Sequence, residues 1–129
     1  MAKLVSSKPR KQRKARAQAP MHMRRKMMHM HVAKSLRAKL GTNRRAMLVK
    51  KGDKIRVISG SMRKKEGKVM EVDYHNLSIF VEGIARKNAK GIEKLARLQP
   101  SNAEIIDGDF NSADRKAMLG RSSGTGAKK

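Results

Sequence analysis

The fold of this chain is decided by residues 50–73, which read KKGDKIRVISGSMRKKEGKVMEVD. Gly52 and Asp53 are typical of a turn that leads into a strand. Gly60 should end that strand at a corner where a bulky side chain would strain the backbone, and Gly67 should let the chain return to the sheet. The segment therefore predicts two strands joined by a basic loop.

Alternating apolar and polar side chains, typical of half-buried strands, continue after this segment. Turn residues separate the alternating runs at His75-Asn76 and at Pro100-Ser101-Asn102, and a basic loop is expected at 83–91. Short strands with closely spaced turns favour a mainly β fold, built as a small closed barrel. The expected strands cover residues 54–59, 67–73, 77–82, 92–98 and 103–107.

The N-terminal part is expected to begin as an extended basic arm over residues 1–19. Its stretch KPRKQRKARAQA has a cation at nearly every second position and little to bury. In isolation such a segment should be a solvated tail that becomes ordered against phosphates on binding.

Two short helices are predicted after Pro20, which suits a first helical turn. The spacing of Met23, Met27 and Met30 places them on one helical face. Val32, Leu36 and Leu40 form a second apolar stripe, followed by Gly41 at a position that suits a left-handed helix end. The stripes should pack on the body of the protein or on a neighbour.

These patterns divide the chain into three segments. Residues 1–46 form a basic arm with two short helices, and residues 47–107 form the barrel. Residues 108–129 hold a last short helix, capped by Ser112 and running to Leu119, with a frayed tail.

The charge of the chain is one-sided. Residues 1–51 contain 17 Lys and Arg and no acid, whereas the remaining 78 residues contain 16 basic and 10 acidic side chains. The net charge of +23 therefore splits into +17 and +6. Such a charge repels itself and favours a polyanionic partner, above all nucleic acid, whose phosphates release counterions when neutralised.

Several other classes of protein find little support. The chain has no Cys, so disulfides and Cys-based zinc sites are excluded, and no apolar run approaches a membrane span. No secretory signal is recognisable, and a transit peptide is the weaker interpretation of the basic N-terminus because the bias continues past residue 30. No nucleophile motif or phosphate loop indicates an enzyme or a cofactor. The Met- and His-rich stretch MHMRRKMMHMH is interpreted as apolar filler with mild cations rather than a metal site.

The central segment resembles the KOW motif of RNA-associated proteins, in which Gly-Asp, Gly, a basic loop and Gly-Lys-Val follow one another. QRKARAQAPMHMRRKM before it and VEGIARKNAKG after it resemble the universal large-subunit ribosomal protein twenty-four family, in its archaeal and eukaryotic form. The resemblance covers residues 8–119. In the family, a Gly often stands where this chain has Lys64, so the loop is expected to follow a slightly different path.

The resemblance implies an SH3-like barrel that binds ribosomal RNA near the 5′ part of the large-subunit molecule. It also implies a cytoplasmic, ribosomal location by the exit of the peptide tunnel and a contribution to early subunit assembly. Neighbouring ribosomal proteins are implied as partners, and the nascent chain and targeting factors as further candidates. The motif residues that carry over are Gly52, Asp53, Gly60, Arg63, Lys65, Gly67 and Lys68.

With only three aromatic side chains, the chain has few platforms for stacking single-stranded bases, so we expect recognition of RNA backbone and shape. A KOW-type transcription elongation accessory protein is the alternative. The candidate RNA-binding residues are Lys8, Arg10, Lys11, Arg13, Lys14, Arg16, Arg24, Arg25, Lys26, Arg44, Arg45, Arg63, Lys64, Lys65, Lys68, Arg86, Lys87 and Lys90.

Overall fold

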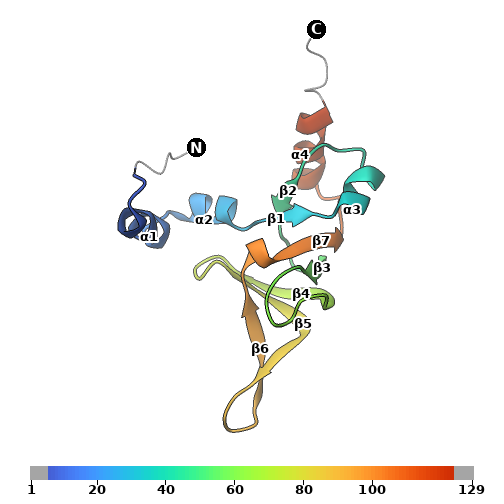
Figure 1. Cartoon of the computed structure of the whole chain (residues 1–129). Helices are drawn as coiled ribbons and strands as arrows, with labels where there is room; N and C mark the ends of the chain where they lie inside the picture. Colours follow the sequence, from blue (N-terminus) through green and yellow to red (C-terminus); the bar gives the residue numbers. More distant parts are fainter. Residues whose placement is uncertain (1–5, 124–129) are drawn as a thin grey trace.

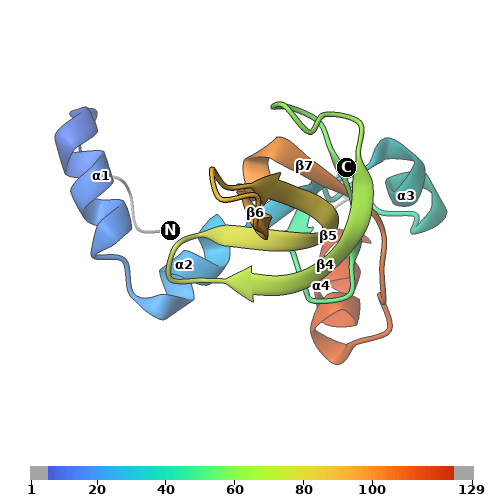
Figure 2. The same cartoon turned by 90° about the horizontal axis from the view of Figure 1, so that it is seen from below.

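In the computed structural model, which describes residues 6–123, the strands form one mixed sheet (Figure 1). They are β1 (His29–Val32), β2 (Ala46–Leu48), β3 (Lys54–Val57), β4 (Glu66–Asp73), β5 (Ser78–Lys87), β6 (Glu93–Leu98) and β7 (Ala103–Asp107). The sheet order is β2-β1-β7-β3-β4-β5-β6, in which β1 and β7 are parallel and the other neighbours antiparallel. Figure 2 shows how strongly β4 curves. The mainly β, barrel-like fold is thus confirmed.

The core of the sheet is built from the alternation seen in the sequence. Ile55 and Val57 of β3 are buried while the cations beside them are exposed, and Val69, Ile79 and Val81 complete the same interior. Burial of these branched side chains provides the main driving force for folding. The strands expected at 54–59, 67–73, 92–98 and 103–107 are confirmed, with small differences at their ends.

Two further strands, β1 and β2, come from the part of the chain that was expected to be helical or arm-like. Met30 and Met47, neighbours in their register, are fully buried, as is Met28 just before β1. The helical assignment of Met30 is therefore wrong. A flexible Met side chain fits a sheet core as well as a helix face, so its spacing alone could not decide between them.

The helices are α1 (Pro9–Ala17), α2 (Met21–Met27), α3 (Lys34–Lys39) and α4 (Ala113–Ser123). The extended conformation expected for the arm is wrong over α1, where Pro9 occupies the first turn. The two helices expected after Pro20 are present but short, and Gly41 takes the left-handed φ of 58° at the end of α3. Figure 1 shows α1 and α2 at one side of the sheet and α4 on another.

The remaining differences concern the hairpin of β5 and β6 and the C-terminus. Residues 83–87, expected in a loop, continue β5 beyond a register shift between Phe80 and Ala85. Gly83, inside this irregular stretch, has a φ of 73°. The last helix extends past Leu119, and the tail expected after residue 123 lies outside the described residues.

Candidate nucleic-acid interface

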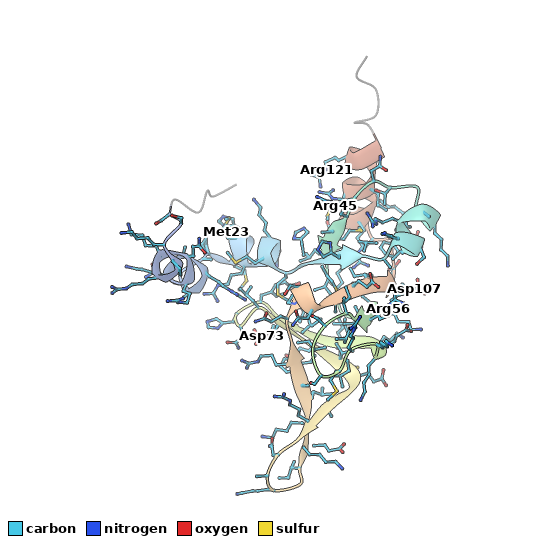
Figure 3. All side chains as sticks on the ribbon, viewed as in Figure 1. Met23, Arg45, Arg56, Asp73, Asp107 and Arg121 are labelled. Carbon is cyan, nitrogen blue, oxygen red and sulfur yellow. The ribbon has the colours of Figure 1, made fainter. Side chains whose placement is uncertain are left out.

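The cations of α1 form the most exposed positive surface of the chain. No side chain of this helix is buried, and its sequence PRKQRKARA contains no acid. Among residues 6–123, no ion-pair or hydrogen-bond partner accompanies the side chains of Arg10, Lys11, Arg13, Lys14 or Arg16. Figure 3 shows them fanning out from the helix. The arrangement gives several guanidinium and ammonium groups that can each meet a phosphate.

The cations of α2 are used partly within the protein. Arg24 donates from Nε to the Ala19 carbonyl at 2.8 Å, from Nη2 to that of Ala17 at 2.9 Å and from Nη1 to that of His75 at 3.2 Å. The Arg25 guanidinium lies 5.8 Å from the centre of the Tyr74 ring. Together they fix α2, and with it α1, against the turn between β4 and β5, while Lys26 stays exposed.

The basic loop between β3 and β4 presents Arg63, Lys64 and Lys65, all exposed. The Lys64 N–H donates to the Val57 carbonyl and the Val57 N–H donates to the Lys65 carbonyl, both at 2.9 Å. Lys64 has a φ of 71°, in the left-handed region that favours glycine. This geometry gives a physical reason why a glycine is common at this position of the family.

The three motif glycines serve two different purposes. Gly52 and Gly60 have φ values of 91° and 99°, which side chains rarely adopt. Gly67 has no such φ, but a Cβ at this position would collide with the Glu82 carbonyl oxygen and come within 2.7 Å of Val81 Cγ1. Gly67 thus lets β4 approach β5 closely.

The hairpin of β5 and β6 carries the third group of cations away from the sheet (Figure 1). Arg86 lies opposite Lys94 in the strand register, and Lys87 pairs with Glu93 at 3.4 Å. Like charges directly opposite one another weaken a sheet unless an anion lies between them. Lys94 was missing from the sequence-based set, and only the register of the hairpin could have revealed it; Lys90 is exposed in the turn.

The other predicted cations are less well placed for a polyanion. Arg44 donates to the Met118 carbonyl at 2.8 Å, whereas Arg45 is exposed. Lys68 lines an open cleft of about 580 Å³ together with Glu66, Asp107 and other residues of mixed charge. Lys8 precedes α1 and is exposed. The cations thus lie on separate projections of the molecule rather than in one patch.

Asp53 of the motif does not face a ligand. Its carboxylate is buried and is bound by Arg115 of α4, while the Lys50 N–H donates to it at 2.8 Å. A Cβ on Gly108 would meet both members of this pair, so that glycine makes room for it. The sequence offered no local signal for Arg115, which lies 62 residues from its partner.

Two exposed charged groups have a shifted pKa. Hydrogen bonds from the backbone and side chain of Asn76 lower the pKa of Asp73, and the N–H of His75 adds to the effect. The hydrogen bond and charge of Glu104 raise the pKa of Arg56. Arg56 is therefore engaged with Glu104 rather than offered to a ligand.

Residues 6–123 hold no group of three His, Asp or Glu side chains arranged to bind a metal ion. In the same part of the chain, no helix is both long and apolar enough to cross a membrane.

Comparison with known proteins agrees with these features. Residues 6–122 match the family of ribosomal proteins described as L26 in eukaryotes and as the P form of L24 in archaea. The large ribosomal subunit protein uL24 of Methanothrix thermoacetophila is 38% identical over 118 residues, which cover 92% of this chain and all of that protein. The chain therefore belongs to this family of archaeal L24 and eukaryotic L26 ribosomal proteins, structural proteins of the large subunit of the cytoplasmic ribosome.

Proposed function

We propose that this protein binds large-subunit ribosomal RNA through contacts to its phosphates and its shape. The observation that carries the proposal is α1, a helix with five cations, no acid and no buried side chain. Nothing in the described fold requires those charges, and their mutual repulsion is relieved when phosphates lie between them.

The barrel would anchor this helix and add contacts of its own. Arg24 and Arg25 hold α2 on the turn between β4 and β5, so α1 leaves the sheet from a fixed point. Exposed cations of the β3–β4 loop and of the β5–β6 hairpin would then meet other RNA segments. Because these groups project in different directions, the protein suits a position between several RNA helices rather than along one groove.

From the family relationship we further propose a role in early assembly of the subunit and a position near the exit of the peptide tunnel. Neighbouring ribosomal proteins would be its protein contacts, and the protruding hairpin is the element best placed to reach the nascent chain or targeting factors. The chain would act by binding and not by catalysis.

Sucrose-gradient fractionation of a native lysate at moderate salt tests the proposal. Stoichiometric amounts of the chain should sediment with the large subunit and with whole ribosomes. Sedimentation with RNA polymerase, or only in light fractions, would instead favour the elongation-factor alternative. Extraction of the subunit with increasing salt should release the chain, because phosphate contacts weaken as salt rises.

A further inference from the structure

The strongest remaining feature is a groove between α1 and the body of the protein. It has a volume of about 550 Å³. One wall is the face of α1 that carries Arg13 and Arg16, and the opposite wall is formed by Gln99 and the 3-10 turn Pro100–Asn102. Met27 and Leu77 also line it. We infer that this groove binds one unpaired nucleotide of the RNA, with its base against the apolar floor and its phosphate at Arg13 and Arg16.

The charge of the groove favours a nucleotide over a neutral ligand. Its lining contains two arginines and no Asp or Glu. Arg13 and Arg16 are three residues apart on a helix, so both guanidinium groups lie on one face. Within residues 6–123, neither has an ion-pair or hydrogen-bond partner. A phosphate can therefore accept hydrogen bonds from both without breaking an existing contact.

The floor of the groove favours a flat apolar group. Met27 keeps 39% of its surface exposed although it is apolar, whereas Leu77 and Pro100 are nearly covered by the protein. A base can lie on such side chains, and an arginine plane can cover its other face. Sites for small ligands usually have volumes of roughly 300 to 1,000 Å³, a range that includes one nucleotide.

Two polar side chains stand where the edge of a base would lie. His29 donates from Nδ1 to the Lys26 carbonyl at 2.7 Å, which leaves Nε2 as an acceptor. The Gln99 amide has no hydrogen-bond partner within the described part of the chain, and it offers both a donor and an acceptor. These groups can satisfy the edge of an unpaired base but cannot reach one that is stacked within a duplex.

This inference rests on the proposed RNA binding, and the test separates the two. The full chain is titrated with two RNA hairpins that differ by a single unpaired nucleotide in the stem. We expect tighter binding of the bulged hairpin by about tenfold, in line with the stacking of one base. Tight binding of both hairpins with equal affinity would overturn the groove but leave the proposed function intact. Binding of neither at moderate salt would overturn both.

Met27→Glu and Met21→Glu form a matched pair for this measurement. Both residues are exposed methionines of α2, and only Met27 lines the groove. Met21→Glu should weaken binding of both hairpins equally and keep their affinity ratio. Met27→Glu should abolish the preference, and a preserved preference would contradict the inference.

A second pair keeps the test independent of folding. The double variant Arg13→Gln with Arg16→Gln removes the same charge from α1 as Lys11→Gln with Lys14→Gln, but only the arginines line the groove. Because α1 buries nothing, neither variant should unfold the protein. Loss of the bulge preference in the arginine variant alone supports the inference, and equal behaviour of the two variants refutes it. If the groove instead binds a peptide segment of a neighbouring protein, the ratio will not change in any variant, and the inference is overturned.

Discussion

Asp53 and Arg115 form a buried ion pair in which Nη1 and Nη2 of the guanidinium meet the two carboxylate oxygens at 2.8 and 2.5 Å. Arg115 also donates to the carbonyls of Asp109 and Leu48, and its guanidinium lies 5.0 Å from the centre of the Phe110 ring. A residue of the KOW motif thus ties the turn before β3 to the C-terminal helix. Its role in this protein is structural.

Arg115→Met should destabilise the protein by about 3–5 kcal/mol, because it leaves the Asp53 carboxylate buried without its partner. Chemical denaturation followed by circular dichroism measures this loss. Lys116→Met, at the adjacent exposed position, should change the free energy of unfolding by less than about 0.5 kcal/mol. The double variant with Asp53→Asn should lose less than the sum of the single changes, and strict additivity would contradict a direct pair.

Lys64→Gly should stabilise the protein despite the loss of a side chain. A left-handed conformation costs a non-glycine residue roughly 1–2 kcal/mol, and the greater freedom of Gly in the unfolded chain offsets part of this gain. A net gain of about 0.5–1 kcal/mol is expected from thermal or urea unfolding. Lys65→Gly, without a positive φ to relieve, should instead destabilise the protein. Equal effects of the two substitutions would argue against strain at Lys64.

Gly67→Ala and Gly120→Ala should have opposite effects. The added Cβ at Gly67 meets the Glu82 backbone and the Val81 side chain, so we expect a loss of about 1–3 kcal/mol. At Gly120, in α4, a Cβ has open space, and the higher helix propensity of Ala should add up to about 1 kcal/mol. Unfolding midpoints in urea compare the two variants directly, and a neutral Gly67→Ala would refute the close approach of β4 to β5.

Asp73→Ala should destabilise the turn between β4 and β5 in a pH-dependent way. The pKa of Asp73 is lower in the folded state than in the unfolded state, so its ionised form contributes stability above the unfolded pKa of about 4. That contribution should decrease as the pH falls through the folded pKa. The difference in unfolding free energy between wild type and variant, measured from pH 7 down to pH 2, should therefore shrink in acid. A constant difference would contradict the hydrogen bonds assigned to the carboxylate.

The sequence predicted those parts of the fold whose signal is local. In β3, Ile55 and Val57 alternate with cations, and the strand formed where that pattern lies. In β1, by contrast, the burial of Met30 depends on its pairing with β2 and β7, which no local pattern indicates. A helix at α1 was missed because its composition favours a solvated chain whether or not it is helical.

The candidate interface could be predicted as a set of cations but not as an arrangement. Exposure of the α1 and loop cations follows from charge, since isolated charges resist burial. The use of Arg24 and Arg44 as internal hydrogen-bond donors depends on carbonyls that the fold brings near from distant parts of the chain, such as those of His75 and Met118. For the same reason the sequence could not reveal the groove beside Arg13.

The salt dependence of RNA binding by a charge variant of α1 tests the central claim most directly. The variant changes all five cations of the helix to Gln, and the RNA is a large-subunit fragment. The slope of log K against log salt concentration should fall in magnitude by about 4, since each lost phosphate contact removes roughly 0.9. The unfolding midpoint should not change, because α1 buries no side chain. An unchanged slope, or a melted barrel, would contradict the account.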